Sequence, residues 1–204
     1  MPLELHPITE CDFSDVTRIQ LAAFDSGIAH MLFPDPMTPE KFQESVDRHV
    51  KCFKSEPDVH YLKVIDTDQN GKMISAAKWR INETERTEEE IQTQLPTPGR
   101  GGEATPAAVA FRQHLCDSRK EFMGTKPFYY PEHHRRGAGA MLVKWGIEKA
   151  DQAQLPSYLE ASEIGKVLYV KLGFYPVKER LFDMTQYGAD GIDCNTVMLR
   201  DPPK

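Results

Sequence analysis

Cysteine is scarce in this sequence, which has only four among 204 residues. No two of them have the C-x-x-C spacing of a zinc site or a redox motif, and the histidines show no metal-ligand spacing. We therefore expect no metal and no disulfide framework, and reduced thiols of this kind fit a cytoplasmic protein. The cysteines are Cys11, Cys52, Cys116 and Cys194.

Long apolar runs and an excess of positive charge are also missing. No apolar stretch approaches the roughly 18 residues that a membrane helix needs. The first residues, MPLELHPITECDF, lack the basic and apolar regions of a signal peptide. The net charge of -6 argues against a general nucleic-acid binder. We therefore expect a protein that binds neither nucleic acid nor membrane.

The hydrophobic periodicity predicts a single α/β domain, which suits the length of the chain. Proline in T-P-E at residues 38–40 is typical of a helix start, and D-Q-N-G at 68–71 predicts a hairpin turn. Asp12 or Ser14 is expected to cap the first helix. Strands are predicted near 3–8, 60–65, 73–81, 158–161, 174–182 and 196–200, and helices up to residue 24 and near 38–53, 107–122, 136–150 and 162–172.

Residues 83–106 differ in composition from the rest of the domain. They are first acidic and then rich in proline and glycine, which predicts a mobile insertion. The acidic run is expected either to attract a cationic amine or simply to form a solvated loop.

Residues 134–140 read H-R-R-G-A-G-A and run directly into an apolar helix. Small residues at a helix N-terminus let an anion approach the unpaired backbone N–H groups, and the two arginines add charge. The G-x-G-x-x-G and Walker patterns both fail here. The pattern alone therefore leaves two interpretations, a phosphate cradle or a basic turn with small residues for packing.

Two motifs in this region resemble those of the GNAT acyltransferase superfamily. The pyrophosphate motif [QR]-x-x-G-x-[GA] matches residues 134–139, with His134 in place of glutamine or arginine, and the phrase L-Y-x-K-L-G-F matches residues 168–174. The resemblance implies a GNAT fold, with a mixed central sheet flanked by helices, and acetyl-CoA as cosubstrate. It implies cofactor contacts from His134, Arg135, Arg136, Gly137, Ala138, Gly139, Ala140 and Ser162. For Ser162, capping of the next helix is an alternative.

The resemblance also implies that a small-molecule amine attacks the thioester directly. Tyr169, which lies about 100° from an expected apolar stripe, is then the candidate acid at the cleft edge. Glu160 is the candidate base. The alternatives are a tyrosine at the core boundary and an exposed edge-strand glutamate. The apolar stripe is Ile164, Val167, Leu168 and Leu172, and the candidate acceptor walls are Phe24, Met31, Phe33 and Trp79, with core packing as the alternative for each wall.

The strand expected before the cradle is unusually short. Only the three residues Phe128-Tyr129-Tyr130 precede Pro131, and a strand of three residues spans about 10 Å. Either residues around Phe122 and Met123 extend this strand, with Cys116 to Gly124 as the segment to look at, or the cofactor site is damaged. The second case predicts a GNAT-fold binding module with reduced or lost catalysis.

Overall fold

The computed structural model describes residues 2–33, 36–96, 105–131 and 138–204. Its centre is one seven-stranded sheet with the strand order β1-β2-β3-β4-β5-β7-β6. Neighbouring strands are antiparallel except β4 and β5, which are parallel. The strands are β1 Leu3–Pro7, β2 Val59–Asp66, β3 Lys72–Asn82, β4 Phe128–Pro131, β5 Ser157–Ser162, β6 Tyr175–Asp183 and β7 Ile192–Arg200. The mixed α/β class predicted from the sequence is confirmed.

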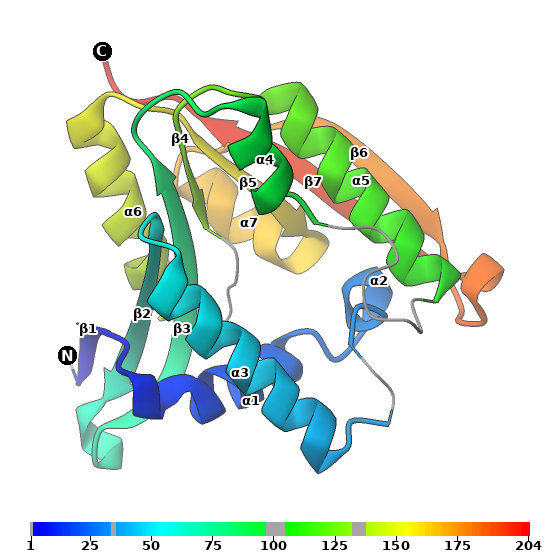
Figure 1. The fold of residues 1–204 in the computed structure, drawn as a ribbon, viewed down its shortest axis with the longest axis horizontal. Helices are drawn as coiled ribbons and strands as arrows, with labels where there is room; N and C mark the ends of the chain where they lie inside the picture. Colours follow the sequence, from blue (N-terminus) through cyan, green and yellow to red (C-terminus); the bar gives the residue numbers. More distant parts are fainter. Residues whose placement is uncertain (1, 34–35, 97–104, 132–137) are drawn as a thin grey trace.

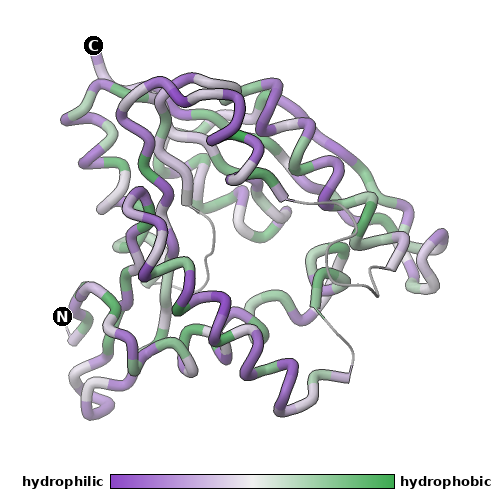
Figure 2. Tube along the Cα trace, in the orientation of Figure 1, coloured by the Kyte–Doolittle hydropathy of each residue, from purple (hydrophilic) through white to green (hydrophobic). Residues whose placement is uncertain are grey.

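Helices cover both faces of this sheet, and Figure 1 shows α3, α4 and α5 in front of it with α7 behind. The helices are α1 Phe13–Ala23, α2 Gly27–His30, α3 Pro39–Ser55, α4 Glu88–Gln94, α5 Pro106–Phe122, α6 Gly139–Ala153 and α7 Glu163–Lys171. Along α3 and α5 hydrophilic and hydrophobic residues alternate (Figure 2), as expected for helices with one buried side. Short 3-10 turns are η1 Glu10–Asp12, η2 Thr67–Gln69 and η3 Met184–Tyr187.

The two faces of the sheet carry different sets of buried side chains. One face, which we call the α6 face, packs Trp79, Tyr129 and Leu159 against α6 and α7. The opposite face, the α5 face, packs Tyr61 under α1 and α3, and Tyr158 close to the C-terminal end of α5. Because side chains alternate along a strand, neighbours in sequence on β4 and β5 belong to opposite faces.

The helix cap predicted for α3 is observed, and the cap predicted for α1 is not. Thr38 Oγ1 accepts the Lys41 N–H at the start of α3, as the T-P-E pattern predicts. The cap expected for α1 is wrong, because Asp12 has helical backbone angles and no side-chain bond into α1. Its carboxylate instead accepts the Thr9 N–H and forms an ion pair with Lys63.

The segment 83–106 is partly ordered into secondary structure. Helix α4 begins with a capping box between Thr87 and Glu90, and its Ile91 and the following Leu95 are buried. The mobility of the segment stays a prediction, and residues 97–104 lie outside the described residues.

Trp79 belongs to the core of the α6 face. It has no exposed surface, and its indole N–H donates to the Leu142 carbonyl at 3.1 Å. A side chain at Gly146 would lie 2.2 Å from Trp79 Cζ2, so α6 approaches the sheet closely only because this residue is glycine. The core alternative for Trp79 is therefore confirmed.

Within the described residues, no helix combines the length and apolar composition that crossing a bilayer requires. Each cysteine is a free thiol, and Cys11 alone among them is exposed.

Candidate active site

Strands β4 and β5 pair over a very short distance. β4 has four residues, which pair with β3 from Phe128 to Pro131, but its only described pair with β5 is Tyr129 with Ser157. On β5, residues 158–162 have no described strand partner on the β4 side. We call this region, the single pair and residues 158–162, the β4–β5 junction.

Within the described residues β4 begins at Phe128 and includes Pro131; because the residues after Pro131 lie outside the described part of the chain, the short length of this strand stays a prediction. The expected extension from upstream is wrong, because residues 116–122 belong to helix α5 and Met123 is its C-cap with helical backbone angles. Gly124 then adopts a φ of 51°, which turns the chain toward β4. The physical reason is that the α5 pattern continues up to the residue before this glycine.

The start of α6 lies beside α7 at this junction. Ala138 has helical backbone angles, Gly139 is the first helical residue, and Ala140 follows it. Among the described residues, a Cβ at Gly139 would meet Leu168 of α7, at 3.6 Å, and Gly139 itself is buried. The other predicted cradle residues, His134, Arg135, Arg136 and Gly137, lie outside the described residues.

Ser162 ends β5 and caps the next helix. Its Oγ accepts the Gly165 N–H at 3.3 Å, so the capping alternative is confirmed, while contact with a ligand stays a prediction. Gly173, just after α7, has a φ of 89°, as is typical of a glycine that ends a helix.

Tyr169 is buried, and the stripe predicted for its helix is wrong. Tyr169 packs with Phe174 under the sheet, whereas Ile164 and Val167 are 70% and 59% exposed. The reason is that α7 follows β5 without a loop, so the exit of the strand sets the rotation of the helix rather than its most apolar residues. Burial raises the pKa of the Tyr169 phenol.

The ring of Tyr169 leans toward the N-terminal end of α7. Its Cε2 lies 3.0 Å from the point where a Cβ of Gly165 would be, and Ser162 Oγ lies 3.4 Å from the same point. Helical side chains generally lean in this direction. The phenol ring therefore lies close to Ser162, where β5 ends.

Glu160 lies on the α5 face, opposite to Tyr169, and its carboxylate accepts four hydrogen bonds. Arg119 of α5 donates to both of its oxygens, at 2.8 and 3.1 Å. The Tyr130 hydroxyl donates at 2.5 Å and the Tyr158 hydroxyl at 3.0 Å. Its side chain is only 6% exposed, so the expectation of a solvent-exposed edge position is wrong. β5 lies between β4 and β7 in the sheet, and α5 covers this face.

Arg119 is the functional candidate that the sequence analysis missed. Its guanidinium lies over the Tyr130 ring, 4.5 Å from the centroid, and also donates to the Tyr130 hydroxyl. No local signal identifies it, because Glu160 is 41 residues further along the chain. Burial and the nearby Glu160 raise the pKa of Tyr158 well above its usual range. This keeps the Tyr158 hydroxyl protonated as a donor.

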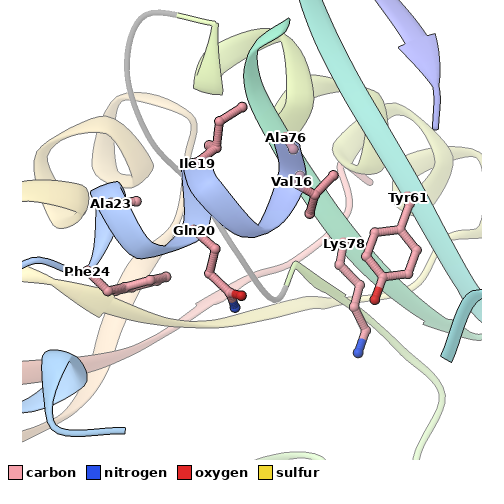
Figure 3. A pocket seen from close by; sticks show the side chains of 9 residues that line it. Val16, Ile19, Gln20, Ala23, Phe24, Tyr61, Ala76 and Lys78 are labelled. Carbon is pink, nitrogen blue, oxygen red and sulfur yellow. The ribbon is translucent and has the colours of Figure 1, made fainter. Parts of the chain in front are cut away.

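A pocket lies between α1 and the sheet (Figure 3). Its lining is mainly apolar, and the polar ends of Gln20, Tyr61 and Lys78 lie on one side of it. His49 connects two of these, with its ring nitrogens 3.0 Å from Gln20 Oε1 and from the Tyr61 hydroxyl. We call it the α1 pocket.

Of the four predicted acceptor walls, only Phe24 lines the α1 pocket. Phe33 stacks on Phe24 with 6.1 Å between ring centroids. Met31 packs against a separate cluster that includes Ile28 and Phe111, and Trp79 lies on the other face of the sheet.

Solved acetyltransferases have the same fold over the whole chain. One is a histone acetyltransferase HPA2 and related acetyltransferase of Corynebacterium glutamicum. It matches over 100% of this chain and 98% of that one, with a TM-score of 0.62 and 19% identity. It matches arylalkylamine N-acetyltransferase 2 of Aedes aegypti over 100% of both chains, with a TM-score of 0.63 and 14% identity. A GNAT superfamily phosphinothricin acetyltransferase of Sinorhizobium meliloti, solved with AcCoA, matches at 13% identity and a TM-score of 0.57, over 99% of this chain and 89% of that one.

Sequence comparison gives a shorter match. A stretch of 40 residues is 45% identical to "Probable acyltransferase SID5" of Ajellomyces capsulatus. That stretch is 20% of this chain and 29% of the length of that protein. No family model matches the sequence. The chain therefore has the GNAT acetyltransferase fold that its two motifs predicted.

Proposed function

We propose that this GNAT-fold chain is an N-acetyltransferase that moves the acetyl group of acetyl-CoA to the amine of a small molecule. The observation that carries the proposal is the β4–β5 junction. At this junction, where residues 158–162 have no strand partner on the β4 side among the described residues, Tyr169 lies on the α6 face and Glu160 on the α5 face. The start of α6 lies beside α7 on the α6 face.

The residues around the start of α6 fit the pyrophosphate of coenzyme A. The backbone N–H groups of the first helical turn have no intrahelical partners, and the helix dipole favours an anion there. Gly139 presents no side chain there, and among the described residues its nearest neighbour, Leu168, would lie 3.6 Å from an added Cβ. By resemblance to the family motif, His134, Arg135, Arg136 and Gly137 complete the cradle with Ala138 and Ala140, and Ser162 contacts the cofactor from β5.

The two sides of the junction suit the two proton movements of the reaction. The bound cosubstrate supplies an activated acetyl group as a thioester. When the amine nitrogen bonds to the acetyl carbon and the carbon–sulfur bond breaks, the amine loses a proton and the sulfur gains one. The phenol of Tyr169, whose raised pKa keeps it protonated, is the proposed donor to the sulfur.

Glu160 is the proposed acceptor of the amine proton, acting through a neighbouring hydroxyl. Four hydrogen bonds already reach its carboxylate, so an amine would have to displace one of them for direct contact. A proton passed to the Tyr130 oxygen, with the Tyr130 proton moving to Glu160, needs no displacement. We therefore assign Tyr130 as the intermediate carrier and Arg119 as the residue that positions Glu160.

The acceptor is proposed to enter from the α5 face, where the α1 pocket lies. The lining of the pocket is mainly apolar, which suits the apolar body of an amine. Structural neighbours include acetyltransferases named for arylalkylamines and phosphinothricin, which are small molecules.

The test of this proposal is Gly139→Val, with Ala153→Val at the exposed far end of the same helix as control. The added methyl groups occupy the space that we assign to the pyrophosphate. By calorimetry, Gly139→Val should weaken coenzyme A binding at least about tenfold, or 1.4 kcal/mol, while Ala153→Val and the parent bind alike. Unchanged affinity in a folded Gly139→Val protein would exclude the cradle. Failure of the parent to acetylate any amine in a panel of aryl, alkyl and polyamine acceptors would exclude the reaction.

One observation favours a second candidate, a binding module with reduced or lost catalysis. The described part of β4 has four residues, and Pro131 has no N–H to donate to a bound pantetheine. Two or three missing hydrogen bonds, at about 0.5–1.5 kcal/mol each, would weaken binding by about one to three decades in Kd. Inserting an alternating apolar segment of about seven residues between Tyr130 and Pro131 should then tighten acetyl-CoA binding. Low-micromolar affinity and ordinary turnover in the parent would rule out this candidate.

A further inference from the structure

A second pocket lies on the α5 face beneath α4. Three arginines line it, Arg80, Arg86 and Arg119, and its apolar lining includes Ile91, Leu95 and Phe128. Its described lining contains no carboxylate. We call it the α4 pocket. It is separate from the α1 pocket, with which it shares no lining residue.

Two of the three guanidinium charges are balanced by carboxylates outside the pocket. Arg80 forms ion pairs of 2.5 Å with Glu56 and with Asp58. Arg119 forms its ion pair with Glu160, at 2.8 Å. These two arginines therefore have structural reasons to be where they are.

Arg86 differs, because it is 9% exposed and its hydrogen bonds go to neutral acceptors. Its Nη1 donates to Gln94 Oε1 at 2.7 Å, and its Nη2 donates to the carbonyls of Gly124 and Lys126 at 2.5 and 3.4 Å. Its Nε is buried without a hydrogen-bond partner. Within the described part of the chain, no carboxylate lies at ion-pair distance from it. Burial, and the nearby Arg80, lower its pKa.

A second unsatisfied donor lies on the other side of Gln94. The Gln94 amide nitrogen donates to Asn82 Oδ1 at 3.3 Å, and Asn82 Nδ2 is itself buried without a partner. Gln94 thus bridges two side chains that each have an unused N–H. Buried donors without acceptors cost free energy, and a buried charge without a counter-charge costs more.

The lining of the α4 pocket is apolar around this charge. The guanidinium of Arg86 stacks over the Phe128 ring, 4.4 Å from its centroid, and Ile91 and Leu95 are buried nearby in α4 and just after it. A purely structural role, in which Arg86 fastens α4 to the turn at 124–126, explains the Nη bonds. It explains neither the absence of a direct ion pair among the described residues nor the unused Nε, although Asp58 and Glu90 lie close enough to act on the charge of Arg86.

We propose that the α4 pocket binds a small carboxylate with an apolar body, with Arg86 as the counter-charge. The carboxylate accepts from Arg86 and the apolar part packs against Ile91, Leu95 and Phe128. A carboxylate suits a guanidinium better than a single-atom anion does, because two parallel N–H groups can bind its two oxygens. This site goes beyond the proposed acetyl transfer and does not depend on it.

The test uses direct binding of phenylacetate to the full chain, followed by thermal shift and calorimetry. Phenylacetamide serves as the uncharged analogue and inorganic phosphate as the anion without an apolar body. Phenylacetate should raise Tm in a saturable way, and phenylacetamide and phosphate should each bind at least about tenfold more weakly, a difference of 1.4 kcal/mol. Equal binding of phenylacetate and its amide, or no binding of phenylacetate, would overturn the charge assignment. Equal binding of phosphate would overturn the apolar part.

Variants locate the site. Arg86→Met should abolish the shift with phenylacetate, and Arg18→Met, which removes an exposed arginine paired with Asp15, should leave it unchanged. If Arg86→Met does not fold, backbone amide chemical shifts of the parent replace it. Phenylacetate should then move the signals of Gly124 and Gln94 and not that of Ala23, which lines the α1 pocket. Movement confined to Ala23 would refute the proposal.

Discussion

Replacing Arg119 by methionine should be among the most costly single changes on the α5 face. The change removes both N–H groups that bind Glu160 and leaves a carboxylate with 6% exposure and only two hydroxyl donors. Removing one partner of a buried ion pair lowers the free energy of unfolding by about 3–5 kcal/mol, because the remaining charge stays desolvated. Since a domain has roughly 5–15 kcal/mol of stability in total, this is a large fraction of it.

The assay is urea unfolding followed by circular dichroism. Arg119→Met should lower the midpoint without changing the dependence of stability on urea concentration. The matched control is Lys178→Met, which breaks the ion pair of β6 with Glu121, also on α5, with side chains 38% and 53% exposed. Such an exposed pair contributes about 0–1 kcal/mol.

A double variant separates charge from packing. In Arg119→Met/Glu160→Gln the uncompensated charge is absent, so much of the lost stability should return. The reasoning is refuted if Arg119→Met costs no more than Lys178→Met, or if the double variant is less stable than Arg119→Met alone.

Three further predictions follow from the same contacts. Gly146→Ala places a methyl 2.2 Å from Trp79 and should cost about 1–3 kcal/mol or more, seen as a lower Tm, whereas Gly139→Ala, with 3.6 Å to its nearest neighbour, should not. Burial lowers the pKa of His114, so at mildly acidic pH the unfolded chain binds a proton at this residue and the folded chain does not. The free energy of unfolding should therefore decrease as the pH falls below about 6.5, and it should decrease less in His114→Gln. Equal pH slopes of the unfolding free energy in the two proteins would contradict this. Tyr169→Phe should lower kcat with little change in KM for acetyl-CoA, and an unaltered kcat at neutral pH removes Tyr169 from the mechanism.

The sequence by itself determined the elements whose signals are local. Thr38 caps α3 and Ser162 caps α7 because a cap acts within three residues of its own position. The start of β4 at Phe128 was visible because Pro127 precedes it, and the two GNAT motifs pointed to the fold that solved acetyltransferases share with this chain.

Tertiary structure alone decided which side chains meet. Arg119 and Glu160 lie 41 residues apart, and no local pattern relates a residue of α5 to one of β5. Tyr169 is buried because β5 leads directly into α7 and fixes its rotation, although Ile164 and Val167 gave the more apolar stripe. Residues 160 and 169 are placed on opposite faces of the sheet by strand alternation and by the helix that covers each face. Hydrophobic periodicity indicates which side of a helix or strand is buried, but only the packing of distant elements determines which residues lie against that side.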